Sequence, residues 1–157
     1  MPLYFAYGSN LDWKQMRRRC PSAQFVCVAK LKGHRFDITR CSAKRGCGVA
    51  DVVADNSCDV WGVVYEIDEG DWERLDRCEG CHPQLPQDKS AYVRRECHVL
   101  IGGDERQPLL TQTYFANREC NPPPPSKSYM DQIIEGAKHW RLPQDYIRML
   151  KQIEVKQ

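Results

Sequence analysis

The chain has 157 residues, of which 41% are hydrophobic and 28% are charged. This length predicts a single domain over residues 1–157, which would bury about 68–70% of the surface that the unfolded chain exposes. No apolar run approaches the roughly 20 residues needed to span a bilayer, so a helical membrane protein is excluded. The net charge of +2 comes from 23 basic and 21 acidic residues scattered along the chain, which gives no electrostatic footprint for nucleic acid.

Residues 1–8 contain too few apolar side chains for the hydrophobic region of a secretory signal. We therefore expect a cytoplasmic protein in a reducing compartment. There the nine cysteines, an odd number, should be mostly free thiols that pack as small buried hydrophobes.

Short apolar or alternating runs separated by Gly, Asn, Asp and Ser predict five strands in the first part of the chain. They cover residues 3–7, 25–31, 35–39, 48–53 and 60–67. A short helix is expected after Leu11, and the basic cluster at residues 17–19 would form its solvated face.

Residues 68–79 read as a short helix, which starts at an acidic cap and ends at Gly80 in the left-handed conformation. The spacing of three and four residues places several side chains near one face of this helix, namely Trp72, Leu75, Cys78 and Glu79. A carboxylate that is partly desolvated among apolar groups has a raised pKa, which suits a general base or acid near neutral pH. Glu79 is therefore a candidate catalytic residue.

A polar loop at residues 81–90 leads to a predicted hairpin, whose strands at 91–101 and 109–116 are joined by a turn at 102–104. Four prolines at residues 122–125 favour a stiff connector. Two helices follow, one at residues 128–140 and one after Pro143. Their apolar faces comprise Tyr129, Ile133, Gly136, Ala137 and Trp140, then Tyr146, Met149, Leu150 and Ile153. This order predicts an α+β fold around a mixed, mainly antiparallel sheet or small barrel with flanking helices.

The first strand runs into Tyr7-Gly8-Ser9-Asn10-Leu11. Such a turn can direct several main-chain N–H groups into one concavity, which suits a carboxylate or a developing oxyanion. It can equally be an ordinary strand-to-helix turn that is capped by Ser9 or Asn10.

Cys78-Glu79-Gly80-Cys81-His82 fits the pattern for covalent haem attachment. Haem attachment generally needs export, which the N-terminal residues do not indicate. No second cysteine pair or histidine pair completes a zinc site at the usual spacing. The two cysteines fit a pair of small buried thiols equally well.

Four blocks follow one another along the chain: Phe5-Ala6-Tyr7-Gly8-Ser9-Asn10-Leu11, Val60-Trp61-Gly62-Val63-Val64-Tyr65, Leu75-Asp76 with Glu79-Gly80, and Gly136-Ala137 with Leu142-Pro143 and Tyr146. Together and in this order they resemble the gamma-glutamylcyclotransferase family. The resemblance covers about residues 3–154. It implies a compact mixed fold around a small barrel and an enzyme that releases 5-oxoproline from a gamma-glutamyl compound without a cofactor or metal.

On this resemblance Glu79 matches the catalytic glutamate. The residues implied to bind the substrate are Tyr7, Gly8, Ser9, Asn10 and Leu11, with Tyr92 and Tyr129 lining the same cavity. The Tyr-Gly-Ser-Asn-Leu loop looks like the branch that acts on gamma-glutamyl amino acids or related small amides. The implied partner is a small molecule, and a homodimer is left open.

Two other functions stay open at this point. One is a binding module of the same fold without activity, and the other is a thiol or haem redox protein that uses Cys78 and Cys81. Within the family the two cysteines are a departure, and they imply that oxidation of a thiol next to Glu79 would stop the reaction.

Overall fold

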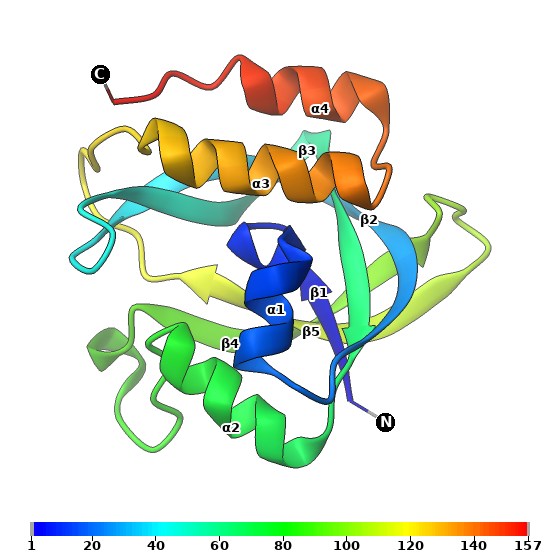
Figure 1. The fold of residues 1–157 in the computed structure, drawn as a ribbon, viewed down its shortest axis with the longest axis horizontal. Helices are drawn as coiled ribbons and strands as arrows, with labels where there is room; N and C mark the ends of the chain where they lie inside the picture. The colour runs from blue at the N-terminus through cyan, green and yellow to red at the C-terminus, as the bar shows by residue number, and fades with distance from the viewer. Residues whose placement is uncertain (1, 157) are drawn as a thin grey trace.

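In the computed structural model, which describes residues 2–156, five strands close into a barrel in the order β1-β3-β2-β4-β5 (Figure 1). The strands are β1 (Leu3–Ala6), β2 (Gln24–Ser42), β3 (Cys47–Glu66), β4 (Tyr92–Ile101) and β5 (Pro108–Ala116). Neighbouring strands are antiparallel except β1 and β5, which run parallel where Tyr4 faces Gln112. The predicted α+β fold with a mixed, mainly antiparallel barrel is confirmed.

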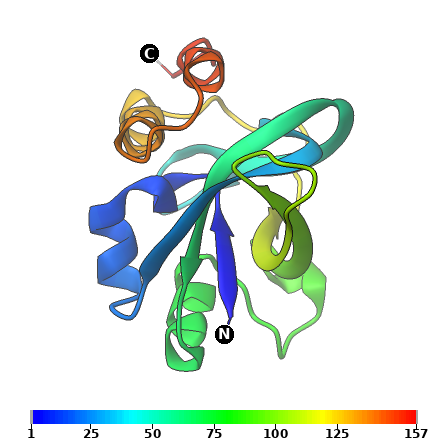
Figure 2. The same cartoon turned by 90° about the vertical axis from the view of Figure 1, so that its right-hand side faces the viewer.

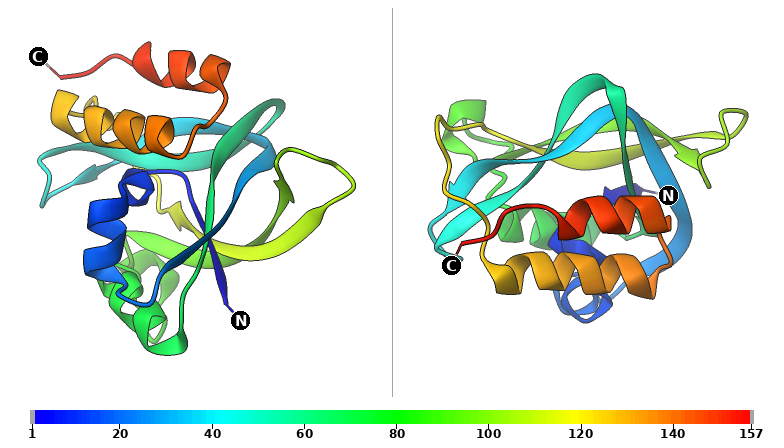
Figure 3. Two further views of the ribbon diagram at one scale, coloured as in Figure 1. Left: turned by 45° about the vertical axis from the view of Figure 1, so that its right-hand side comes forward. Right: turned by 90° about the horizontal axis from the view of Figure 1, so that it is seen from above.

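In the described part of the chain, four α-helices and two short 3-10 helices flank the barrel. They are η1 (Ser9–Leu11), α1 (Trp13–Arg19), α2 (Glu69–Cys78), η2 (Gln87–Lys89), α3 (Lys127–His139) and α4 (Gln144–Lys151). Helices α3 and α4 lie side by side over one side of the barrel, α2 lies at the opposite end, and α1 lies between them (Figures 1, 2 and 3). Among residues 2–156, no helix has the length and apolar character required to cross a bilayer.

The two longest strands correct the prediction of four short ones. Strands β2 and β3 pair continuously, and the register shifts between Lys32 and His34, where two strands were predicted to end. Gly33 lies opposite residues 55–58 there, an irregularity of the pairing that does not end the ladder. Glycine and polar residues mark turns and bulges alike, so the sequence pattern did not distinguish the two.

The terminal helices hold the N-terminal loop in place. In α3 the predicted apolar face is buried from Tyr129 to Ala137, whereas Trp140 lies just after the helix and is half-buried. A Cβ added to Gly136 would lie 2.5 Å from the main-chain carbon of Leu11. The Trp140 indole donates to the Leu11 carbonyl at 2.9 Å. In α4 the prediction was wrong for Met149, which is 36% exposed, whereas Ile147 is buried in its place. The loop after β1 is thus pressed between α3 and the barrel.

Candidate active site

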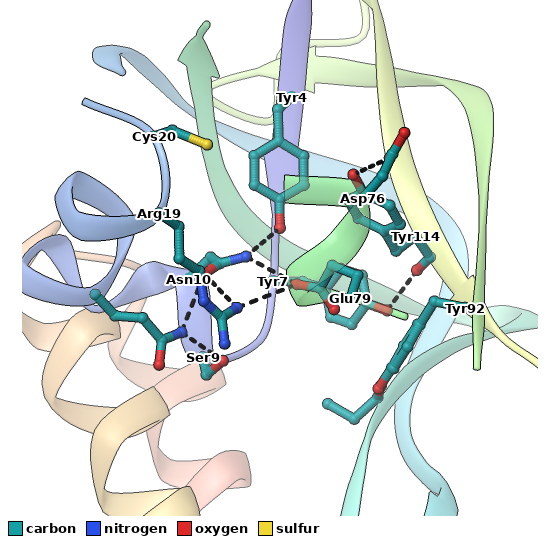
Figure 4. Close-up of polar contacts among 12 residues, drawn as sticks. Tyr4, Tyr7, Ser9, Asn10, Arg19, Cys20, Asp76, Glu79, Tyr92 and Tyr114 are labelled. Carbon is teal, nitrogen blue, oxygen red and sulfur yellow. Dashed lines mark hydrogen bonds and ion pairs between the residues drawn. The ribbon is translucent and has the colours of Figure 1, made fainter. Parts of the chain in front are cut away.

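Glu79 follows the last residue of α2 and points into the molecule (Figure 4). Asp68 caps the start of this helix as predicted, and its carboxylate accepts from the main-chain N–H of Asp71 at 3.3 Å. Trp72 and Leu75 are buried, which fixes the face that α2 turns to the barrel. Gly80 then takes the predicted left-handed conformation, with φ of 65°. Burial of the apolar face therefore aims Glu79 inward at the end of the helix.

The side chain of Asn10 links Glu79 to the loop after β1. Its Nδ2 donates to Glu79 Oε1 at 3.0 Å and to the Tyr4 hydroxyl at 2.9 Å. Its Oδ1 accepts from Gln15 Nε2 at 3.0 Å and from Arg19 Nη1 at 3.1 Å. Because Gln15 and Arg19 donate to Oδ1, the side-chain amide of Asn10 must turn its NH₂ group toward Glu79.

The two oxygens of Glu79 have different surroundings. Oε1 accepts from Asn10 and is also 3.4 Å from Arg19 Nη1, whereas Oε2 accepts no hydrogen bond from any of residues 2–156. The side chain is 17% exposed. Burial raises the pKa of Glu79, while the nearby charge of Arg19 and the Asn10 hydrogen bond oppose that rise. Oε1 is thus held in place, whereas Oε2 is open to a hydrogen-bond partner from outside residues 2–156.

The loop between β1 and α1 presents unused main-chain donors. The N–H of Leu11 is bonded to the Gly8 carbonyl at 3.0 Å, so it is occupied within the turn. The N–H groups of Gly8, Ser9 and Asn10 find no acceptor within the described chain, residues 2–156. The Tyr65 hydroxyl donates to the carbonyl of Asn10 at 2.9 Å and holds the loop from below. Three adjacent free N–H groups can bind an anion or a polarised carbonyl.

Tyr92 and Tyr129 are both held by the main chain of Ala50. The Tyr92 hydroxyl donates to the Ala50 carbonyl at 2.5 Å, and the Ala50 N–H donates to the Tyr129 hydroxyl oxygen at 2.9 Å. Burial raises the pKa of both phenols, so both keep their protons near neutral pH. The hydroxyl proton of Tyr92 is therefore committed to the Ala50 carbonyl, whereas the hydroxyl of Tyr129 acts as an acceptor there and its proton remains available for another hydrogen bond.

A cleft of about 360 Å³ leads inward and ends in a small cavity of about 30 Å³. The two spaces share Ser9, Glu79, Tyr92 and Tyr129. The inner cavity is lined by Tyr4, Tyr7, Gly8, Ser9, Asn10, Ala50, Glu79, Tyr92, Tyr114 and Tyr129. Seven of the eight predicted site residues therefore meet at one place. Leu11 lines neither space and is fully buried beneath α3.

Several residues of the site were not predicted. Tyr4 and Tyr114 line the inner cavity, and their sequence pattern is that of core tyrosines. Arg19 corrects the interpretation of residues 17–19 as a solvated face, because its side chain is only 18% exposed and pairs with Glu79. The chain offered no local signal for this pairing, since Arg19 and Glu79 are 60 positions apart.

The cysteines also depart from the prediction. All nine are free, but only Cys20, Cys47 and Cys81 are buried. Cys78 is exposed at the last turn of α2 and lines the outer cleft, so its placement on the apolar face was wrong. No cluster of three or more metal-binding side chains occurs within residues 2–156.

A closed barrel whose cleft ends beside an oriented glutamate and free main-chain N–H groups defines a protein with a pocket suited to a small polar molecule. Comparison with known proteins narrows this class. Residues 59–150 match the model of the AIG2-like family. The gamma-glutamylcyclotransferases of Mus musculus and Homo sapiens are each 34% identical over 97% of this chain and 78% of their own length.

A solved structure described as a gamma-glutamyl cyclotransferase aligns with a TM-score of 0.86 and 33% identity over 99% of this chain and 89% of its own. A Homo sapiens crystal structure described as an uncharacterized protein aligns with a TM-score of 0.85 and 34% identity, over 98% of this chain and 88% of its own. The chain belongs to the AIG2-like family, in the group that includes the gamma-glutamylcyclotransferases.

Proposed function

We propose that this chain is a gamma-glutamyl cyclotransferase, which cleaves a gamma-glutamyl amide into 5-oxoproline and a free amine. The observation that carries the proposal is the unbonded Oε2 of Glu79 at the end of a cleft that also holds free main-chain N–H groups. The names of the relatives described above support it.

The first task of such an enzyme is to fold the glutamyl chain so that its α-amine meets its own γ-carbonyl carbon. Well-oriented intramolecular reactions reach effective molarities on the order of 10⁵–10⁸ M, so positioning alone supplies much of the rate. The free N–H groups of Gly8, Ser9 and Asn10 suit the glutamyl α-carboxylate. The free hydroxyl proton of Tyr129 suits the γ-carbonyl oxygen as it becomes an oxyanion.

Glu79 then moves protons between the two nitrogens. Its carboxylate takes a proton from the α-ammonium group, and the freed amine forms a bond to the γ-carbon and gives a tetrahedral oxyanion. Glu79 gives this proton to the original amide nitrogen, and the carbonyl reforms as the bond from the γ-carbon to that nitrogen breaks. The attacking nitrogen still carries two protons, and one of them passes through Glu79 to the departing amine, so the products are 5-oxoproline and a protonated amine. The electron pair of the broken bond leaves with the amine, and Glu79 is restored as a carboxylate.

We further propose a cytoplasmic lyase or acyltransferase related to glutathione metabolism. Its partner is a small gamma-glutamyl compound rather than nucleic acid or a membrane, no cofactor takes part, and a homodimer stays a prediction. The loop at residues 7–11 favours gamma-glutamyl amino acids or small amides as the substrate.

The test is release of 5-oxoproline from gamma-glutamyl dipeptides, gamma-glutamyl amines and glutathione. We expect Glu79→Gln to lower kcat by about 10²–10⁴, since general acid and base catalysis contributes this much. Glu73→Gln is the matched control, because Glu73 lies exposed on the same helix. Release that survives Glu79→Gln would contradict the mechanism.

The assay also separates the alternatives. If the wild-type protein binds these compounds but releases nothing from any of them, a binding module of the same fold is favoured. For the redox alternative the readout is the absorption spectrum, because haem attached at Cys78 and Cys81 would give a strong Soret band.

A further inference from the structure

The outer part of the cleft is densely cationic. The basic residues that line it are Arg19, Arg40, Lys44, Arg45 and Arg77. An adjoining groove of about 710 Å³ repeats four of these and adds Arg18 and Arg74. Three of the seven basic residues come from the tip of the β2–β3 hairpin and its approach, and four come from α1 and α2. Elements that are far apart in the sequence thus converge to place positive charge around one opening.

Little negative charge balances this cluster. Glu79 is the one carboxylate in the linings of the cleft and the groove. Arg18, Lys44 and Arg77 pair with no acidic side chain of residues 2–156, and Arg45 bonds only to neutral groups. Because the whole chain carries a net charge of only +2, the excess is local to this opening. Low-dielectric walls lined by one sign of charge raise the local concentration of opposite charge.

The position of this charge relative to the reacting bond decides what it can bind. The cleft meets the inner cavity at Ser9, Glu79, Tyr92 and Tyr129, where the γ-carbonyl of the substrate would lie. The group beyond the scissile bond must then extend into the outer cleft, whose lining includes Lys44 from the β2–β3 turn and Arg77 from α2. A neutral amine would leave these cations unpaired, whereas carboxylates would pair with them.

We propose that the outer cleft is the subsite for the leaving amine and that it selects anionic leaving groups. The substrates are gamma-glutamyl derivatives of acidic amino acids, whose leaving amine carries two or more carboxylates. This inference rests on the function proposed above, since it names the substrate class of the same site. Glu79 lines the inner end of the same cleft.

The test compares gamma-glutamyl-glutamate with gamma-glutamyl-glutamine, which have nearly the same shape and differ by one charge. We expect kcat/KM to be about 5- to 20-fold higher for the acidic substrate at low salt, as for a few partly exposed charge pairs. The preference should shrink in 1 M salt, where the screening length falls to about 3 Å. Any effect of salt or mutation on Glu79 cancels in the ratio, because both substrates use this residue alike.

The double variant Lys44→Gln/Arg77→Gln should bring the ratio to within about twofold of one, because the two strongest candidates for pairing are removed. Arg106→Gln is the matched control: its side chain is 88% exposed and lies in the turn between β4 and β5. A wild-type ratio near or below one would overturn the proposal, as would a double variant that slows both substrates equally. If neither substrate releases 5-oxoproline, the proposed function itself fails, which is a different result.

Discussion

The carboxylates of Asp51 and Glu79 are both largely shielded from solvent, but their hydrogen-bond surroundings differ. Asp51 in β3 is fully buried, and each of its oxygens accepts two hydrogen bonds. The donors are the main-chain N–H groups of Val52 and Ala116, the Thr39 hydroxyl and the Arg118 guanidinium. Glu79 has two donors on one oxygen and none on the other among residues 2–156.

This difference indicates a structural role for Asp51 and is consistent with the proposed acid and base role of Glu79. A carboxylate whose oxygens are both saturated has no room for a substrate proton, and it stabilises the fold by satisfying buried donors. A carboxylate with donors on only one oxygen is held in a fixed orientation, and its other oxygen can accept a hydrogen bond or a proton from a substrate. Burial alone therefore does not distinguish the proposed catalytic group from Asp51, whereas the number of hydrogen-bond donors on each carboxylate oxygen does.

The first prediction tests the structural half of the comparison. Asp51→Ala should lower the free energy of unfolding by about 2–6 kcal/mol, since each of two buried main-chain donors loses its acceptor at roughly 1–3 kcal/mol. Denaturant unfolding with an unchanged m-value is the measurement. Glu79→Ala provides the contrast, because Asn10 Nδ2 retains the Tyr4 hydroxyl as an acceptor. Equal losses in the two variants would remove the distinction.

The second prediction concerns Tyr129, the residue proposed to donate a hydrogen bond to the developing oxyanion. Tyr129→Phe should lower kcat by about 10²–10³, the usual effect of removing one donor to an oxyanion. KM should change less, because the hydroxyl acts mainly on charge that develops in the transition state. In Tyr92→Phe the lost proton was already donated to Ala50, so a smaller fall in kcat is expected. If Tyr92→Phe lowers kcat more than Tyr129→Phe does, Tyr92 rather than Tyr129 is the donor to the oxyanion.

The third prediction concerns the packing that holds the loop. Gly136→Ala would force a methyl group into the main chain of Leu11, so we expect a loss of about 1–3 kcal/mol in stability together with reduced kcat. Gly70→Ala is the control in another helix, where an added Cβ meets nothing within 4 Å. That variant should gain about 0.5–1 kcal/mol from helix propensity and retain its activity. Calorimetry and 5-oxoproline release measure both effects.

The smallest predicted effect is the pH dependence of stability at Glu79. Because burial raises its pKa above the ordinary value of 4.5, the folded chain holds this proton more tightly than the unfolded chain. The free energy of unfolding should then fall as pH rises from about 4.5 through the raised pKa, and Glu79→Gln should abolish that fall. Activity should change in the other direction, with kcat/KM increasing as Glu79 ionises.

Unfolding curves of the wild type and Glu79→Gln at a series of pH values measure the difference. If Glu79→Gln is less stable than the wild type above the raised pKa, ionisation of the Glu79 carboxylate does not lower the free energy of unfolding, and the prediction fails.

The sequence supported the fold and much of the site through local patterns. Helix α2 was predicted from its cap and its glycine end, and Glu79 was found because it lies one turn after the buried Leu75. Cys78 was misplaced by the same rule, because α2 ends at this residue and no other element covers it. The periodicity of a helix predicts which of its faces is apolar, but it does not indicate how far along the helix the rest of the protein packs against that face.

By itself, the sequence determined the main elements, the inward aim of Glu79 and the turn after the first strand, because these depend on residues within a few positions of one another. Only the tertiary structure decided which partners those groups meet. Arg19, Ala50 and Tyr129 come to Glu79 and its cavity from α1, β3 and α3, through the closure of the barrel and the packing of α3 on the loop. A hydrogen bond or charge pair between distant segments involves only two positions, so it produces no repeated spacing of residue types that the sequence could reveal.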